Sequence, residues 1–291
     1  MPRGKTQRTK DLIAACADIL REIEPASVRA VCYRLFTMGL IDSMAKTNTN
    51  KVSTALVYAR EEGLIPWEWI VDETREAERV SAWSDLAAFS GVVQRAYRRD
   101  RWVQQPRRLE IWSEKGTVRG TLGPVLRTYA VTFRVMHGYA SATAINEVAD
   151  ETEDLDEPLI VLYAGDWDPS GLHMSEIDLP SRLAEYGANV VIRRIALSQN
   201  DVSLGGLPSF LAETKRQDPR WQWFTRRYGE RCWELDALSP VVLRERVEQE
   251  IVAIIDAAAW ERAAAVEQVE RESLADVMGK WREAISMQAT E

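Results

Sequence analysis

Two aspartates separated by a single residue follow an apolar run near the middle of the chain. The run is PLIVLYAG, and Asp166 and Asp168 follow it directly in the stretch DWDPSG. A loop after a strand can turn both carboxylates toward one divalent cation, whose charge offsets the repulsion between them. Oxygen ligands of this kind suit Mg²⁺, with Mn²⁺ as a substitute, so the spacing predicts a metal site.

The same pair has a purely structural alternative. Aspartate is common in turns because its side chain hydrogen-bonds to nearby backbone groups. Two features favour the metal: the preceding run is apolar enough for a central strand, and Glu114 ends another predicted strand. Phosphatases of the haloacid dehalogenase type also carry Asp-x-Asp at a strand end. Their motif continues to Thr or Val, whereas Pro169 and Ser170 follow here.

Strand-like and helix-like segments alternate from residue 106 onward, which predicts an α/β domain with a parallel sheet covered by helices. Functional residues of such sheets gather beyond the carboxyl ends of the strands, where both aspartates and Glu114 fall. A long Ala- and Glu-rich helical segment follows residue 239. The expected strands are RRLEIWSE, AVTFRVMHG, PLIVLYAGDWD and NVVIRRIAL.

The first 75 residues have a different pattern. Apolar periodicity predicts three helices, over residues 6–22, 28–38 and 47–62, the second behind the N-cap Ser27. The stretch IPWEWIV then alternates like a short strand. Three helices followed by a strand outline a winged helix-turn-helix, with Lys51 and Arg60 on the predicted recognition helix. Many proteins that do not bind DNA also use this fold.

Charge is distributed unevenly along the 291 residues. Residues 1–60 hold ten Lys and Arg against five Asp and Glu, and residues 91–134 hold ten against three. These segments carry +5 and +7, so the rest carries −20 to give the net charge of −8. Two basic segments on an acidic chain suit a local phosphate-binding face, with a merely uneven surface as the alternative.

No apolar run approaches the length needed to cross a membrane. The three cysteines, Cys16, Cys32 and Cys232, are odd in number and far apart, which favours a reducing compartment over a disulfide framework. We therefore expect a cytoplasmic protein, associated with the nucleoid if it binds DNA.

Four motifs in order resemble the Toprim domain, in the form found in the A subunit of type IIB topoisomerases and in the related meiotic double-strand-break transesterases. The family has Glu-Lys after its first strand, Gly-Tyr after its second, Asp-x-Asp-Pro-x-Gly after its third, and Leu-Pro beyond its fourth. The matching residues are Glu114-Lys115, Gly138-Tyr139, Asp166, Asp168, Pro169, Gly171 and Leu207-Pro208. The family lysine before Gly-Tyr is replaced here by His137.

The resemblance implies that Glu114, Asp166 and Asp168 hold one or two Mg²⁺ ions against a scissile DNA phosphate. It also implies a winged-helix domain with a catalytic tyrosine, and the segment SVRAVCYRLF places that residue at Tyr33. Helical geometry supports the choice: Tyr33 falls roughly 130° from the centre of the apolar stripe of its helix. The alternative is an ordinary exposed or interface tyrosine.

A tyrosine hydroxyl, with a pKa of about 10, needs help to attack at neutral pH. Arg29, one turn before Tyr33, is the residue expected to lower that pKa or to neutralise the phosphate. In the family, the tyrosine forms a 5′-phosphotyrosyl bond and frees a 3′-hydroxyl. One chain's tyrosine works with the partner chain's metal site, which implies a homodimer. The residues expected to contact double-stranded DNA are Arg34, Lys51, Arg60, Lys115 and His137.

Three functions remain open: a DNA transesterase, a Toprim nuclease that hydrolyses DNA without a covalent adduct, and a DNA-binding protein without catalysis. The chain has no G-x-x-x-x-G-K-[Ser/Thr] motif, so ATP-driven strand passage requires a separate ATPase (B-type) subunit. The expected organisation is a winged-helix domain over residues 1–75 and a helical linker over 76–105. A Toprim domain over 106–238 and a helical tail over 239–291 follow.

Overall fold

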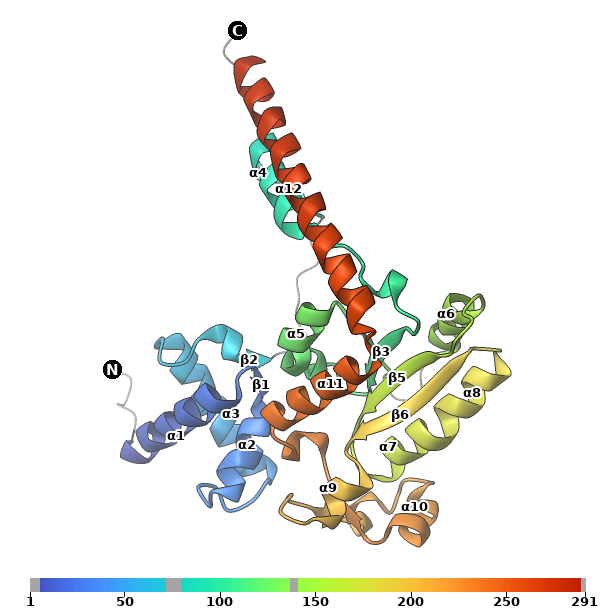
Figure 1. The fold of residues 1–291 in the computed structure, drawn as a ribbon. Helices are drawn as coiled ribbons and strands as arrows, with labels where there is room; N and C mark the ends of the chain where they lie inside the picture. The colour runs from blue at the N-terminus through green and yellow to red at the C-terminus, as the bar shows by residue number, and fades with distance from the viewer. Residues whose placement is uncertain (1–5, 72–79, 137–140, 289–291) are drawn as a thin grey trace. The chain divides into compact units, whose positions relative to one another are not determined.

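The computed structural model describes residues 6–71, 80–136 and 141–288. They belong to two compact units. The first unit comprises Met1–Thr74 and Leu109–Ala253, and the second comprises Arg75–Arg108 and Ile254–Glu291. Figure 1 shows the elements of both units. Among the described helices, none is both long and apolar enough to cross a membrane.

Three helices open the first unit, as the sequence predicts: α1 (Gln7–Ile23), α2 (Val28–Thr37) and α3 (Lys46–Glu61). Ser27 caps α2, because its hydroxyl accepts a hydrogen bond from the Ala30 amide at 3.0 Å. Gly39 and Gly63 follow α2 and α3 with φ of +70°, a conformation that glycine adopts without strain. The apolar faces of the helices meet in a core that includes Ile13, Cys16, Leu20, Val31, Leu35, Val52 and Leu56.

The prediction of a strand over IPWEWIV is mostly wrong. Trp67–Trp69 forms a 3₁₀ turn, η1, and only Ile70–Val71 is extended, as β2. The turn follows Pro66, whose carbonyl accepts from the Trp69 amide, and Trp67 is 59% exposed rather than packed. β2 pairs in parallel with β1 (Ala26–Ser27). Within residues 6–71 no antiparallel wing follows α3, so the winged form of the fold stays a prediction.

The centre of the first unit is a parallel four-stranded sheet, which confirms the α/β class. Its order is β4-β3-β5-β6, with all three pairings parallel. Every residue of the two central strands is buried, as expected for strands covered on both faces. The bounds are β3 (Leu109–Ser113), β4 (Thr132–Val135), β5 (Leu159–Ala164) and β6 (Val190–Ala196).

Helices connect the strands: α5 (Thr117–Tyr129), α6 (Ala142–Thr152), α7 (Pro169–His173) and α8 (Leu179–Glu185). The sequence predicts one helix over residues 174–187. The structure starts it earlier, at Pro169 behind the N-cap Asp168, and inserts a π-helical turn, η3 (Met174–Asp178). Pro180 follows that turn, and a proline that cannot donate to an α-helical ladder accounts for a local change of helical pitch.

A smaller layer follows β6. It contains α9 (Gln199–Ser203), the antiparallel pair β7 (Phe210–Leu211) and β8 (Arg231–Cys232), α10 (Trp221–Tyr228), and two 3₁₀ turns, η4 (Ala212–Lys215) and η5 (Leu235–Ala237). The last helix of this unit is α11 (Pro240–Ile254). Arg244 of α11 donates to the carbonyls of Ile23, Pro25 and Thr121 at 3.2–3.3 Å, which ties the three-helix part to α5.

The second unit pairs α4 (Leu86–Ala96) with α12 (Ala257–Gln288), which lie side by side in Figure 1. The turn η2 (Trp102–Gln104) follows α4. Arg101 binds Glu267 at 2.9 Å, and the Trp102 and Trp260 rings meet edge to face at 5.5 Å. Of the expected tail over 239–291, only the part from Ile254 onward thus packs against the expected linker in the second unit.

Replacing Arg244 should destabilise the first unit. In Arg244→Ala, three carbonyls lose their donor, so we expect the free energy of unfolding to fall by about 1–3 kcal/mol. Chemical denaturation measures this change. The matched control is Arg262→Ala, at an exposed position of α12, which should stay within about 0.5 kcal/mol of the parent. Equal stability of the two variants would contradict the role given to Arg244.

Candidate functional site

The carboxylates at the ends of β3 and β5 come together. Ser113 and Ala164 are paired in register at the ends of these neighbouring strands. Glu114 therefore leaves the sheet beside the loop that carries Asp166, and the Asp166 amide donates to a Glu114 carboxylate oxygen at 3.4 Å. The structure thus brings together the two loops that the sequence singles out.

These carboxylates crowd one another in a region of low solvent access. Burial, together with the charges of Asp166 and Asp168, raises the pKa of Glu114 to about 7. Burial also raises the pKa of Asp166, although Lys115 works in the opposite direction. Asp168 is only 5% exposed. Because desolvated like charges destabilise each other, this group requires cations.

Two lysines supply positive charge. The Lys115 ammonium lies 2.8 Å from an Asp166 oxygen and 3.1 Å from an Asp236 oxygen. The Lys215 ammonium lies 3.2 Å from an Asp168 oxygen. Although burial opposes it, the charges of Asp166 and Asp236 raise the pKa of Lys115, so this lysine stays protonated.

Each aspartate also accepts a backbone hydrogen bond. The Leu235 amide donates to Asp166 at 2.7 Å, and the Gly171 amide donates to Asp168 at 2.8 Å, where Asp168 caps α7. A side chain at Gly171 would place its Cβ only 2.5 Å from the Asp166 carbonyl oxygen. The glycine in Asp-x-Asp-Pro-x-Gly is therefore required by the close approach of α7 to the loop.

The donor types fit Mg²⁺, although the side chains are not arranged as a ready metal site. Among the described residues, no group of three His, Cys, Asp or Glu side chains is positioned for metal binding. Glu114, Asp166 and Asp168 offer only oxygen ligands, and their mutual repulsion favours a divalent cation. Binding would require Lys115 and Lys215 to release their aspartates.

A partly buried arginine, which the sequence does not single out, holds the aspartate loop. Arg194 on β6 donates to the Gly165 and Leu197 carbonyls at 2.8 Å and also to the Asp166 carbonyl. Its guanidinium lies 5.4 Å from the centre of the Tyr163 ring. The available signal is an Arg-Arg pair inside the apolar strand NVVIRRIAL, because a charge in a largely apolar strand needs dedicated partners.

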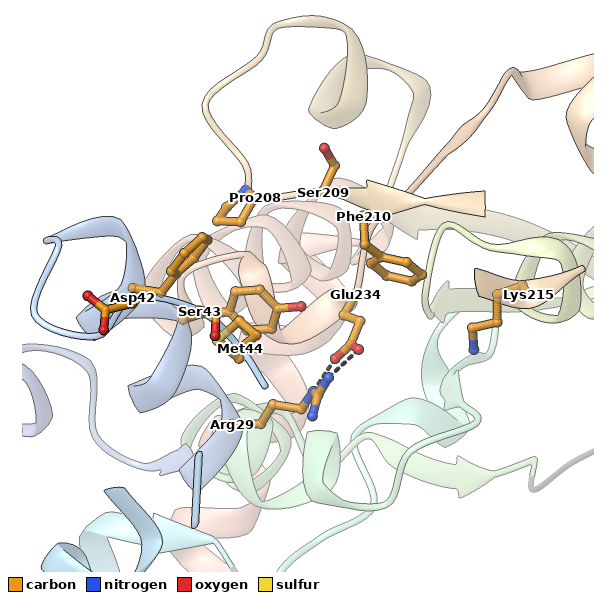
Figure 2. A pocket seen from close by; sticks show the side chains of 11 residues that line it. Arg29, Asp42, Ser43, Met44, Pro208, Ser209, Phe210, Lys215 and Glu234 are labelled. Carbon is orange, nitrogen blue, oxygen red and sulfur yellow. Dashed lines mark hydrogen bonds and ion pairs between the residues drawn. The ribbon is translucent and has the colours of Figure 1, made fainter. Parts of the chain in front are cut away.

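Tyr33 lines a pocket of about 380 Å³ in the first unit. It lies outside the three-helix core, as its distance from the apolar stripe predicts, yet it is only 5% exposed. The residues that cover it come from the segments around Phe210 and Glu234, which lie far from it in the sequence. Figure 2 shows this pocket, whose lining includes Arg29, Ser43, Met44, Pro208, Phe210, Lys215 and Glu234.

Arg29 acts to lower the pKa of Tyr33, as expected, but the other surroundings of Tyr33 outweigh this effect. Burial and the charge of Glu234 raise the pKa of Tyr33 above its ordinary value, and the opposing effects of Arg29 and Lys115 are outweighed. Arg29 donates through two nitrogens to the Glu234 carboxylate, as Figure 2 shows, so its charge is largely neutralised. The Arg29 guanidinium lies 5.9 Å from the centre of the Tyr33 ring.

Two further acidic residues, Glu234 and Asp236, join the site. The sequence favours a capped turn for them, with a position near the site as the alternative. Glu234 and Asp236 lie at η5, a 3₁₀ turn, so the turn itself is confirmed. Asp236 accepts from the Ser27 hydroxyl at the start of α2 and pairs with Lys115. This carboxylate therefore links the helix of Tyr33 to the loop after β3.

The other expected DNA contacts have varied surroundings. Lys51 is exposed on α3. Arg60 stacks on Trp67, with its guanidinium 4.6 Å from the ring centre, and Arg34 pairs with Glu22 at 3.3 Å. His137, Gly138 and Tyr139 lie outside the described residues.

Replacing Arg194 should loosen the aspartate loop. Arg194→Met leaves several carbonyls without their charged donor, so we expect a loss of about 2–3 kcal/mol in the free energy of unfolding. Arg193→Met, at the exposed neighbouring position, is the control and should change little. Thermal or urea denaturation of both variants measures the difference. An equal loss in both would mean that the carbonyl contacts do not stabilise the loop.

Comparison with other proteins adds no identification. No protein-family model matches the chain, and no curated protein matches it significantly. Any function must therefore be inferred from the geometry of the residues around Tyr33 and the carboxylates.

Proposed function

We propose that this protein binds DNA and cleaves its backbone in a Mg²⁺-dependent reaction, with Tyr33 as the nucleophile. The observation that carries the proposal is that Tyr33 shares its cations with the carboxylates. Lys215 lines the Tyr33 pocket and pairs with Asp168, and Lys115, whose charge acts on Tyr33, pairs with Asp166. A nucleophile, positive charges and oxygen ligands within one site are the groups that phosphoryl transfer needs.

The pocket offers a phosphodiester two positive side chains. Arg29 and Lys215 line it, and each is now neutralised by a carboxylate, Glu234 or Asp168. Both cations are about half exposed, so these ion pairs are weak and can be exchanged for a phosphate. A phosphate suits the planar guanidinium of Arg29 especially well. Binding of a phosphate would release Glu234 from Arg29 and Asp168 from Lys215.

The proposed step follows from this exchange. The Tyr33 oxygen attacks phosphorus, an O–P bond forms, and the bond between phosphorus and the 3′ oxygen breaks. Because its pKa is raised, Tyr33 must lose its proton during attack. Glu234, a carboxylate that lines the pocket, can accept this proton once it is released from Arg29. The proton finally resides on the 3′-hydroxyl. A Mg²⁺ ion held by Glu114, Asp166 and Asp168 would stabilise the charge that develops on the phosphate.

A second candidate is hydrolysis of DNA at the same carboxylates. The raised pKa and the low exposure of Tyr33 favour it, because a poorly ionised and covered hydroxyl is a weak nucleophile. Water would then attack in place of Tyr33, and no covalent adduct would form. In either case the proposed substrate is duplex DNA, and strand passage would require a separate ATPase subunit.

Covalent attachment distinguishes the two candidates. End-labelled DNA is incubated with protein and Mg²⁺, quenched with detergent, and assayed for label on protein. Tyr33→Phe should carry at least about 100-fold less label than the parent, because phenylalanine has no hydroxyl that could form the bond to phosphorus. The control Tyr186→Phe, at an exposed tyrosine after α8, should retain it.

The same assay has two contrary outcomes. Cut DNA without attached label, unchanged in Tyr33→Phe but lost in Asp166→Ala, would establish the hydrolytic candidate. Intact DNA at every Mg²⁺ concentration would reject both.

Binding should depend on salt, because phosphate contacts release counterions. We expect the affinity for duplex DNA to fall steeply between about 50 and 300 mM salt, with little sequence preference. Lys51→Ala, which removes an exposed cation of α3, should lower the slope by about 0.9, whereas Lys280→Ala on α12 should not. Filter binding or anisotropy across the salt series measures both. An affinity that does not change with salt would contradict the proposed DNA interface.

A further inference from the structure

One tyrosine hydroxyl is enclosed beside the carboxylates without a hydrogen bond. Tyr163 lies near the end of β5 and is fully buried, with 0% of its surface exposed. Among the described residues, none is a hydrogen-bond partner of its hydroxyl. A buried hydroxyl without a partner has lost its contacts with water and gained none in exchange, so its position calls for a physical reason.

The backbone of the aspartate loop lies against this hydroxyl. A Cβ at Gly165 would lie 2.7 Å from a ring carbon of Tyr163 and 3.1 Å from the hydroxyl oxygen. Glycine permits this close approach of ring and backbone, which a larger residue would prevent. Gly165 directly precedes Asp166, so the hydroxyl lies at the base of the loop that carries both aspartates. The unpaired donor is therefore part of the candidate site.

Glu114 lies on the same side of the sheet as Tyr163. Trp112 and Tyr163 are paired in register across β3 and β5, and Glu114 follows Trp112 by two residues. Because side chains two residues apart along a strand share a face, this alternation carries Glu114 to the side of Tyr163. The charges agree with this placement: after burial, the charge of Glu114 has the largest effect in raising the pKa of Tyr163.

Glu114 is also the least restrained of the three carboxylates. Each aspartate accepts a backbone hydrogen bond at 2.7 or 2.8 Å and pairs with a lysine. Within the described part of the chain, Glu114 accepts a longer bond, from the Asp166 amide at 3.4 Å. A carboxylate has about four acceptor positions, and a tyrosine hydroxyl is a donor at neutral pH. An acceptor with positions to spare thus lies on the same face as a donor that has no acceptor.

We infer that the Tyr163 hydroxyl donates a hydrogen bond to Glu114 when Glu114 binds the metal ion, which makes Tyr163 a positioning residue for this ligand. The inference rests on the metal site of the proposed function. Carboxylates that bind metal ions are themselves held by hydrogen bonds, which fix their orientation. Because the hydroxyl makes no hydrogen bond to the described residues, its removal should weaken metal binding without weakening the fold.

Tyr163→Phe removes the hydroxyl and keeps the ring, so it separates these two effects. Binding of Mn²⁺ alone, measured by electron paramagnetic resonance of the free ion, should weaken by at least about 10-fold. The melting temperature in a chelator should not fall, because a buried hydroxyl without a partner contributes no stability. The matched control is Tyr129→Phe, whose hydroxyl bonds Glu248 at the far end of α5 and which should bind Mn²⁺ like the parent. Asp166→Ala should lose the ion, which shows that Mn²⁺ is bound at this site.

The possible outcomes separate the inference from the proposed function. Equal affinity of the parent and Tyr163→Phe for Mn²⁺ would overturn the inference and leave the proposed function standing. A lower melting temperature of Tyr163→Phe in the chelator would also overturn it, since the hydroxyl would then support the fold itself. If the parent binds no Mn²⁺, the inference and the metal-dependent reaction are both rejected. The expected order of Mn²⁺ affinities in a protein that leaves DNA intact would reject the proposed function and keep the inference.

The Mg²⁺ dependence of label attachment gives a second readout under the proposed function. A positioning residue changes the amount of metal that is needed and not the reaction once the metal is bound. In Tyr163→Phe, the Mg²⁺ concentration for half-maximal label should therefore rise by at least about 10-fold, and saturating Mg²⁺ should restore the parent level. Label that stays low at every Mg²⁺ concentration would show that the hydroxyl acts on the reaction itself and would overturn the inference.

Discussion

The arrangement of the first unit depends on how negative charge is neutralised at the carboxyl ends of β3 and β5. Glu114, Asp166 and Asp168 follow strands that are buried throughout, and solvent shields little of their charge. Lys115 and Lys215 pair with the aspartates and thereby make the loops compatible with burial. Lys215 also lines the pocket of Tyr33, and the charge of Lys115 acts on Tyr33. The cations that neutralise the carboxylates therefore also act on the proposed nucleophile.

The supports of this cluster are backbone contacts more than further charges. Arg194 fixes the aspartate loop through carbonyl oxygens, and Gly171 permits α7 to begin against it. Arg244 fixes the three-helix part in the same way, by donating hydrogen bonds to the carbonyls of Ile23 and Pro25. Because these contacts are made to carbonyls, the carboxylates and the cations of the pocket can exchange partners, as the proposed binding of a phosphate and a metal ion requires. Rigid loops with exchangeable ion pairs are thus the physical basis of the proposed chemistry.

The sequence predicts this fold well wherever a local pattern determines the structure. The helices α1 to α3, the N-cap Ser27 and the four parallel strands follow from periodicity, capping residues and alternation of elements. It fails where proline redirects the backbone, at η1 and at the start of α7. For the site, position after a strand was enough to group Glu114 with the aspartates. For Glu234 and Asp236 the sequence favours a capped turn over a position near the carboxylates, because the contact of Asp236 with Lys115 spans 121 residues and only tertiary packing creates it. The burial of Tyr33 likewise arises from tertiary packing, which the sequence pattern does not show.

The proposed chemistry depends above all on Tyr33 being the residue to which cleaved DNA becomes attached. Mass spectrometry of the trapped adduct tests this most directly: protein reacted with DNA and Mg²⁺ is quenched, trimmed with nuclease and digested with protease. We expect one modified peptide, carrying a nucleotide linked through its 5′ phosphate to Tyr33. A nucleotide on any other residue, or cut DNA with an unmodified Tyr33 peptide, would contradict the proposal.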